Sequence, residues 1–189
     1  EGAIKEVSEL LDKLVKAVKT AEGASSGTAA IGEVVDNDAK VADKASVTGI
    51  AKGIKEIVEA AGGSEKLKAV AAAKEGNEKA GKLFGKAGAN AGDSEAASKA
   101  AGAVSAVSGE QILSAIVKAA DAGEQDGEKP AEATNPIAAA IGKGDAENGA
   151  EFNQDGMKKD DQIAAAIALR GMAKDGKFAV KDGGEKGKA

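Results

Sequence analysis

The side chains that most often carry chemistry are missing from this chain. Its 189 residues contain no His, Cys, Tyr or Trp. Without His, the usual general base near neutral pH is absent. Without Cys, there is no thiol nucleophile, no disulfide and no zinc–thiolate site. The composition therefore argues against an enzyme and predicts no catalytic residue, no metal site and no cofactor.

Two stretches have the glycine and lysine spacing of a phosphate-binding loop. Residues 76–82 and 171–177 both match the G-x4-G-K pattern. Leu83 and Phe178 occupy the place of the Ser or Thr that would bind magnesium, and no β-branched strand precedes either stretch. With 26 Gly in the chain, chance matches are expected. We therefore expect no nucleotide binding.

The acidic residues show no order typical of a metal or sugar site. Asp36-Asn37-Asp38 lacks the Gly and the later bidentate Glu of a calcium loop, so a solvated loop tip is the favoured interpretation. A glycosidase-like pair of acids stays open on the sequence alone. Such sites usually surround their sugar with aromatic rings, and three Phe are the only aromatic residues here.

Lysines cluster in the last part of the chain and could meet a sulfated polysaccharide by charge alone. A surface adhesin that binds host glycosaminoglycan is therefore an alternative function. Acids are interleaved among these lysines, and 26 basic against 31 acidic residues give a net charge of −5. This balance argues against nucleic-acid binding. The lysines are Lys158, Lys159, Lys174, Lys177, Lys181, Lys186 and Lys188.

The composition predicts helices. Hydrophobic residues make up 42% of the chain and aromatic residues 2%, and Ala, the best helix former and a poor strand former, is abundant. We expect an all-α fold, a helical bundle of short helices joined by long polar loops, in a single domain over residues 1–189. Loops of more than about 12 residues in a compact domain are usually functional or disordered.

The first segment is the clearest amphipathic helix. Apolar residues recur at three- and four-residue spacing up to a helix end near Gly23, and we expect this stripe to pack on the core of the domain. A coiled-coil or dimer role is a less favoured alternative, because the pattern lasts under three heptads. The stripe continues to Glu1 without a cap, as in a helix that begins earlier in a longer chain. Its residues are Ile4, Val7, Leu11, Leu14 and Val18.

Capping residues mark the starts of several further helices. A second helix ends near Ala61, before the Gly62-Gly63 pair. The starts of the others are Ser64, Asp93-Ser94, the capping box of Ser108 with Gln111, and Asn135-Pro136. Residues 31–35 are predicted to form a short helical turn. Residues 75–93 are predicted to form a mobile loop with one helical turn at most.

The segment from Met157 to Lys181 is the most informative part of the chain. It opens with Asp160 and Asp161, is apolar on every face over residues 163–169, and stops at Asp175-Gly176. A helix that is apolar all round is a buried helix. The side chains expected to be buried are Ile163, Ala166, Ile167, Leu169, Arg170 and Met172.

This segment also resembles, almost word for word, the invariable segment of the Vls surface lipoproteins, the antigenically variable Vmp-like family of Lyme-disease spirochetes. The likeness covers essentially all 189 residues. Residues 1–5 resemble the short repeat that bounds each recombining cassette, and residues 47–63, 81–86 and 93–120 resemble the framework. The resemblance implies that the chain is one cassette, with the constant flanks and the lipid anchor outside it. The chain itself has no signal peptide, no lipidated Cys and no apolar run of roughly 18 residues.

The resemblance implies a lipoprotein on the extracellular face of the outer membrane that evades host antibodies by changing its surface loops. We expect the variation in loops 23–44, 74–92, 123–134, 142–156 and 182–188. It also implies that the segment from Met157 to Lys181 is a strong antibody target, which we expect antibodies to meet mainly on released or unfolded protein. The oligomeric state stays open. The residues expected to be exposed and variable are Ser25, Asp36, Asn37, Glu75, Asn77, Asn90, Glu124, Asp126, Asp145, Asn148, Asp155 and Lys186.

Overall fold

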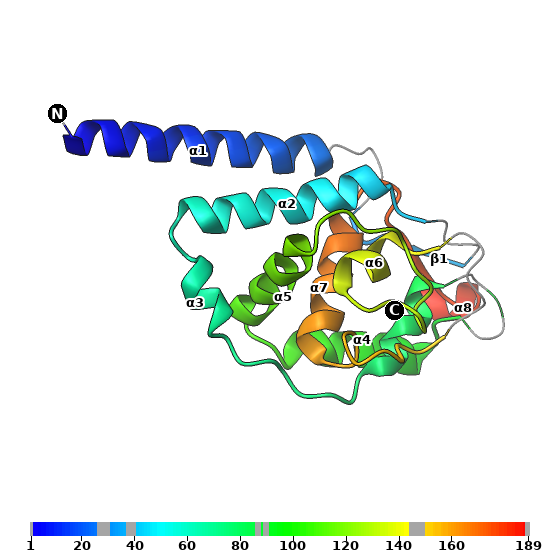
Figure 1. Cartoon of the computed structure of the whole chain (residues 1–189). Coiled ribbons are helices and arrows are strands. Elements are labelled where there is room, and N and C mark those ends of the chain that lie inside the picture. The colour runs from blue at the N-terminus through cyan, green and yellow to red at the C-terminus, as the bar shows by residue number, and fades with distance from the viewer. Residues whose placement is uncertain are drawn as a thin grey trace.

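The computed structural model describes residues 2–25, 31–36, 41–85, 88, 91–143 and 150–187. Within this part, the all-α prediction is confirmed (Figure 1). The elements are α1 (Gly2–Ser25), β1 (Val34–Val35), α2 (Lys44–Ala60), α3 (Ser64–Lys68), the 3-10 helix η1 (Glu78–Phe84), α4 (Ser94–Ser105), α5 (Gly109–Asp121), α6 (Pro136–Ile141), α7 (Asp160–Met172), β2 (Phe178–Ala179) and α8 (Gly183–Lys186).

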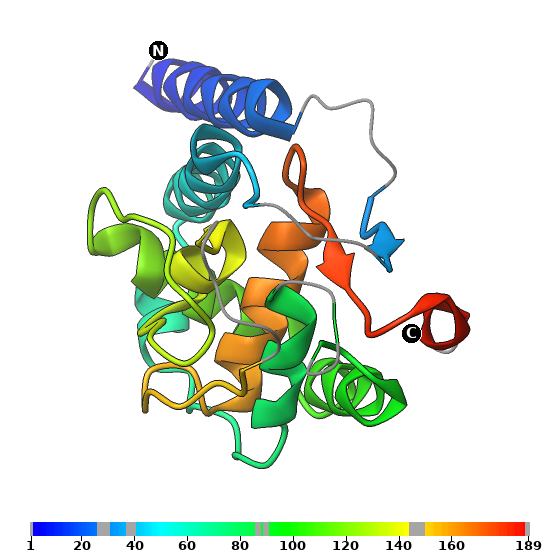
Figure 2. The ribbon, with the colours of Figure 1, turned by 90° about the vertical axis from the view of Figure 1, so that its right-hand side faces the viewer.

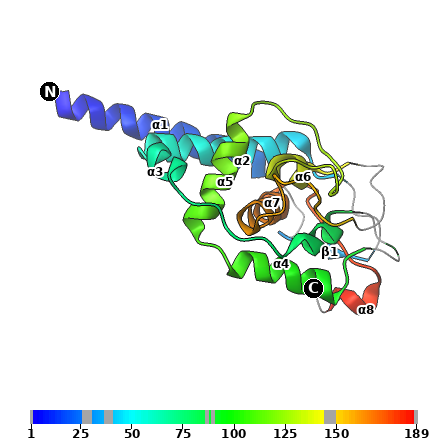
Figure 3. The same ribbon diagram turned by 60° about the horizontal axis from the view of Figure 1, so that its bottom comes forward.

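Helix α7 is the centre of the packing. Helices α2, α4, α5 and α6 and the 3-10 helix η1 all contact it, and Figure 3 shows it enclosed by the other helices. One group of buried side chains joins α7 to α4 and η1, and a second joins it to α2, α5 and α6. Both groups are rich in Ala, so the helices approach closely.

Local capping chemistry sets most of the helix starts, as predicted. Asp93 accepts a hydrogen bond from Ala96 N at 2.9 Å at the start of α4, and Ser108 forms the capping box with Gln111. Asn135 caps α6, with Pro136 in its first turn. The prediction for Ser64 is wrong in detail. Ser64 is the first helical residue of α3, and the preceding Gly63 makes no side-chain cap.

Helix α1 does not bury the stripe that its sequence predicts. Its neighbour is α2. The face of α1 that packs against α2 is the one around Ala17, which is 1% exposed. Gly49 and Gly53 of α2 let the backbones approach, because a Cβ at either position would lie within 2.5–2.7 Å of the Ala24 or Ala21 Cβ. The close approach of these small residues turns the aliphatic stripe away from the core. The following side chains are therefore exposed, contrary to expectation: Ile4, Val7, Leu11 and Val18.

Residues 34–35 form a strand and not the predicted helical turn. Val34 and Val35 of β1 pair in parallel with Phe178 and Ala179 of β2 (Figure 2). Gly32 N donates to Gly171 O at 3.0 Å, which holds the approach to β1 against the end of α7. The partner of these two β-branched Val residues is therefore β2, which follows α7 in the sequence.

Candidate functional site

The buried segment is helix α7 with the turn that follows it. Ile163, Ala166 and Leu169 are each 0% exposed and Arg170 is 1% exposed, while Ile167 is half-buried. The prediction is wrong for Met172, which is 36% exposed. Met172 is the last residue of α7, where the surrounding helices no longer cover every side of the helix.

Two buried acids at the start of α7 hold the segment before η1. Asp160 N donates to Lys74 O at 2.8 Å, and the Asp160 carboxylate accepts from Asn77 Nδ2 at 2.8 Å. Ala73 N donates to Asp161 Oδ1 at 3.3 Å. Asn77 was expected to be freely exposed, which is wrong: its side chain is half-buried and tied to α7.

Arg170 is a buried cation bound by backbone carbonyls. Its Nε donates to Lys177 O at 2.7 Å, and its Nη1 donates to Ala140 O at 2.9 Å and Ile141 O at 3.3 Å. Burial lowers the pKa of Arg170 to about 10, so it stays charged at neutral pH. Through these bonds, one side chain joins α7 to the end of α6 and to the segment before β2.

The three Phe residues of the chain form one cluster that sequence reasoning missed. The Phe84 ring lies 5.3 Å from the Phe152 ring and 5.4 Å from the Phe178 ring, centroid to centroid. All three are buried. Phe84 and Phe152 belong to segments that were predicted to be surface loops, so these loops are anchored in the core. Their rarity is the signal that could have identified them. The three Phe are the only aromatic residues in the chain, and large side chains of this kind are expected in the core.

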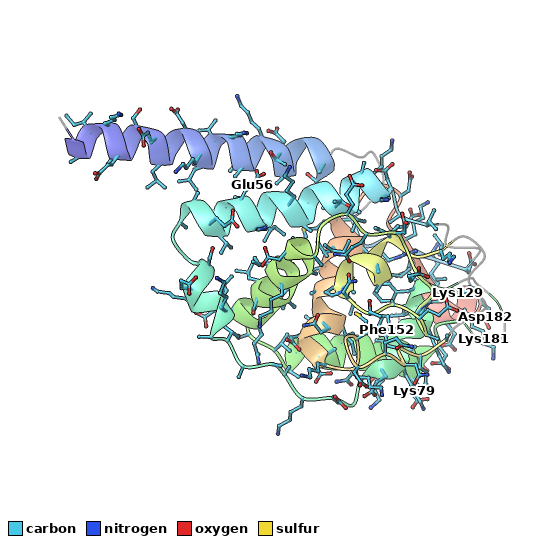
Figure 4. All side chains as sticks on the ribbon, in the orientation of Figure 1. Glu56, Lys79, Lys129, Phe152, Lys181 and Asp182 are labelled. Carbon is cyan, nitrogen blue, oxygen red and sulfur yellow. The ribbon has the colours of Figure 1, made fainter. Side chains whose placement is uncertain are left out.

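Most of the residues predicted to be exposed are at the surface. Figure 4 shows charged side chains extending outward from α1 and from the loops. The exposed ones are Ser25, Asp36, Glu75, Glu124, Asp126, Asp155 and Lys186. The remaining four, Asn37, Asn90, Asp145 and Asn148, lie outside the described residues.

The predicted loops have more structure than the sequence suggested. Residues 74–92 contain η1, with Leu83 and Phe84 buried. In loop 123–134, Ala133 is buried, and Asp126 accepts from Lys44 Nζ of α2 at 2.7 Å. The hydrogen bond from Lys44 lowers the pKa of the Asp126 carboxyl. Residues 182–187 include α8.

The phosphate-loop match at residues 76–82 runs into η1. A Cβ at Gly81 would lie 2.7 Å from Phe152 N and 2.8 Å from Ala150 O. This glycine therefore faces packed backbone, where a phosphate has no room. Among the described residues, no group of three or more His, Cys, Asp or Glu could hold a metal ion.

Two lysines of the last part of the chain have acidic neighbours, and Lys188 lies outside the described residues. Lys158 pairs with Asp155 at 3.1 Å and Lys177 pairs with Glu33 at 2.9 Å. Over the described ranges, no single helix is long and apolar enough to cross a membrane; α4 and α5 reach the required length and composition only together, bent by 99° at their junction.

Comparisons with known proteins agree with this picture. The family described as Borrelia lipoprotein matches residues 1–189. The crystal structure of the variable surface antigen VlsE of Borrelia burgdorferi is similar with 84% identity and a TM-score of 0.93, and the match covers 100% of this chain and 65% of that one.

Two variable large proteins of Borrelia hermsii are also similar. Variable large protein 17 is 40% identical over 185 residues, which cover 95% of this chain and 51% of the relative. Variable large protein 4 is 37% identical over 194 residues, which cover 96% and 55%. The chain thus spans about half the length of these curated relatives. Because the family matches this chain over residues 1–189, the chain belongs to the Borrelia lipoprotein family.

Proposed function

We propose that these residues are the variable part of a surface antigen that evades host antibodies by changing its loops on a fixed helical scaffold. The observation that carries the proposal is the division of the molecule into two parts. Helix α7 and its neighbours bury their apolar side chains, whereas most of the predicted loop residues that the structure describes are exposed. The names of the similar proteins, variable antigen and variable large protein, support it.

The energetics of substitution favour this division. A change of an exposed loop side chain usually alters the free energy of unfolding by less than about 0.5 kcal/mol. A change of a buried Ile or Leu to Ala costs about 2–5 kcal/mol. Selection by antibodies can therefore rewrite the exposed positions, while the buried ones are retained for folding.

We further propose that the anchor and the constant segments lie outside residues 1–189, and that these residues form one helical domain. The similar proteins are longer than this chain, and the family description is a lipoprotein. The proposed location is the outer membrane, facing outward, with host antibodies as partners. The similar proteins are named as antigens and variable proteins, and we propose no catalytic role.

The test is to sequence this locus in many bacteria recovered from one immune host, all descended from one cell. We expect changes at exposed loop positions, with α7 and the buried faces of the other helices unchanged. An unchanged locus, or changes confined to the lysine clusters, would contradict the proposal.

The glycosaminoglycan adhesin gains no support from the comparisons, whose names describe antigens and variable proteins. The pairing of Lys158 and Lys177 with acids also weakens a purely electrostatic site.

A further inference from the structure

Four Asp-Gly pairs occur in the chain, and such a pair can rearrange without an enzyme. The backbone nitrogen of the glycine attacks the side-chain carboxyl carbon of the aspartic acid, and water leaves as a cyclic imide closes. Glycine permits this attack because it has no Cβ to obstruct it. Water then opens the imide at either carbonyl carbon, which gives back aspartate or gives isoaspartate, whose main chain runs through the former side chain. The pairs are Asp126-Gly127, Asp155-Gly156, Asp175-Gly176 and Asp182-Gly183.

Two of these pairs are held by hydrogen bonds that occupy a reacting group. The rearrangement needs a free glycine nitrogen and a carboxyl that can turn back toward its own main chain. Gly176 N donates to Ala173 O at 3.0 Å, so the nitrogen of that pair is engaged. The Asp182 carboxylate caps α8, where it accepts from Gly184 N at 2.8 Å and from Glu185 N at 3.2 Å. Both pairs therefore react only after a local opening of the fold.

The pair at Asp126 is held by a lysine of another helix. Lys44 Nζ of α2 donates to Asp126 Oδ1 at 2.7 Å. This hydrogen bond lowers the pKa of the Asp126 carboxyl, so the protonated carboxyl, which is the form that reacts, is less populated. Glu128 N also donates to Ala138 O at 3.0 Å, which fixes the main chain directly after the pair. The fold therefore slows this third pair as well.

Asp155 differs from the other three aspartates in its freedom. Its side chain is 98% exposed, and its carboxylate pairs with Lys158, three residues later, at 3.1 Å. An exposed pair of this kind restrains a side chain only weakly. The Gly156 nitrogen donates to no group of the described residues. We infer that Asp155-Gly156 is a modification site at which isoaspartate forms spontaneously in the folded protein.

The fold also requires the glycine that makes this pair reactive. A Cβ at Gly156 would collide with the carbonyl oxygen of Thr134, so any side chain there forces the two stretches apart. Gly156 therefore cannot be exchanged for a residue that would protect Asp155 by hindering the attacking nitrogen. The susceptibility follows from the close packing of the main chain. It goes beyond the proposed function, because it holds for any role of the protein.

Isoaspartate at residue 155 would disturb the turn that leads into the buried segment. Met157 N donates to Gln154 O at 2.8 Å, across the pair, and the Met157 side chain is 0% exposed in the same core group as Ile163. The rearrangement inserts the former Cβ into the main chain between these two hydrogen-bonded groups. We expect the lengthened turn to lose this hydrogen bond, so that the Met157 amide exchanges its hydrogen faster.

The test is to age the 189-residue protein at neutral pH and physiological temperature, both folded and in urea. Electron-transfer fragmentation of its peptides locates isoaspartate at each residue, and the gain in mass on deamidation separates Asn148-Gly149, which lies outside the described residues. Asp155→Glu is the matched variant. It keeps a carboxylate at an exposed position, but the attack of the nitrogen would have to close a larger and less favoured ring. Hydrogen exchange at the Met157 amide is followed in both proteins.

In the folded protein, we expect about ten times as much isoaspartate at residue 155 as at residue 175 or 182, because those two need a local opening first. The level at residue 126 should be lower than at residue 155. In urea, the four residues should become similar. Exchange at Met157 should become faster with age in the original protein but not in Asp155→Glu.

Similar levels at the four residues of the folded protein would overturn the inference, because the fold would then make no selection among them. So would a folded protein that accumulates no isoaspartate at residue 155. The same excess at residue 155 in urea would also overturn it, since the local sequence and not the fold would then be the cause. None of these results depends on whether the loops vary, so the antigen proposal is tested separately.

Discussion

The guanidinium carbon of Arg170 lies 5.6 Å from the centroid of the Phe84 ring. Arg170 belongs to α7 and Phe84 ends η1, so this cation–π contact joins the buried helix to a segment that the sequence had suggested was a mobile loop. The ring and three backbone carbonyls together offset the desolvation of a cation that is 1% exposed.

Replacement of Arg170 should therefore be costly even when the charge is kept. Arg170→Lys removes the planar group that reaches Lys177 O and Ala140 O at once, and leaves a buried ammonium with poorer geometry. We expect a loss of about 2–4 kcal/mol in the free energy of unfolding, measured with urea. The control is Lys174→Met at an exposed position, where the expected change is under about 0.5 kcal/mol. Equal effects of the two substitutions would contradict this role.

Phe152 should behave as a core residue although it lies in a predicted surface loop. Phe152→Ala removes a side chain that is 2% exposed and contacts the Phe84 ring. The expected loss of stability is about 3–5 kcal/mol. Asn153→Ala, next to it and exposed, is the matched control and should be close to neutral. Thermal unfolding of both variants gives the comparison, and a stable Phe152→Ala protein would show that the loop is not anchored.

Gly53 should resist replacement even by Ala. In an open helix, Gly→Ala adds about 0.5–1 kcal/mol of stability. Here the new Cβ would lie 2.7 Å from Ala21 Cβ and 2.9 Å from its Cα, so α1 must move away from α2. We expect Gly53→Ala to increase amide hydrogen exchange in residues 17–25. Gly2→Ala, which has nothing within 4 Å, should leave that exchange unchanged. If Gly53→Ala gave slower exchange, the close contact would be refuted.

Asp93 should make the stability depend on pH in the acid range. The hydrogen bond from Ala96 N lowers the pKa of the Asp93 carboxyl below its usual value of 3.8. A carboxyl whose pKa is lower when folded stabilises the fold fully above the unfolded pKa, and this stabilisation is lost as the pH falls through the folded value. Asp93→Ala should cost about 1 kcal/mol near neutral pH. Urea unfolding should show a cost that shrinks as the pH falls below 3.8 and through the lower folded pKa; a cost that does not change with pH would show that the charge has no part in the cap.

Antibodies against the segment from Met157 to Lys181 should distinguish a peptide from the folded protein. Ile163, Ala166 and Leu169 are inaccessible in the fold, so an antibody that binds these side chains requires local unfolding. The apparent affinity then falls in proportion to the unfolded fraction. We expect the antibody to bind the peptide roughly 100-fold more tightly, equivalent to about 3 kcal/mol. Equal affinities, measured by surface plasmon resonance, would show that the segment is accessible on the intact surface.

The sequence predicted what local chemistry decides. The capping box of Ser108 with Gln111 and the Asn135-Pro136 start involve residues a few positions apart, so their pattern is visible in the chain. The burial of residues 163–166 and of Leu169 also follows from a helix that is apolar on every face. These features do not depend on which other segment lies nearby.

The errors concern contacts between distant segments. Val34 forms a strand because Phe178 lies beside it, and no local pattern contains that neighbour. The loops at residues 84 and 152 were read from their polar composition, although single Phe side chains fix them in the core. For α1, periodicity predicted an apolar stripe, but the small residues at Gly49 and Gly53 decide which face is seated.

The Phe84–Phe152 contact has a consequence for the surface of the molecule. Each ring fixes one point of its loop in the core, and residues 153–155, directly after Phe152, are exposed. A few extra residues in a loop whose two ends are fixed increase the entropic cost of closing that loop. This cost rises by only about 0.6 kcal/mol for each doubling of the loop length. We therefore expect insertions and deletions to be tolerated at the exposed residues 153–155, so variants can differ in the contour of their outer surface as well as in its charge.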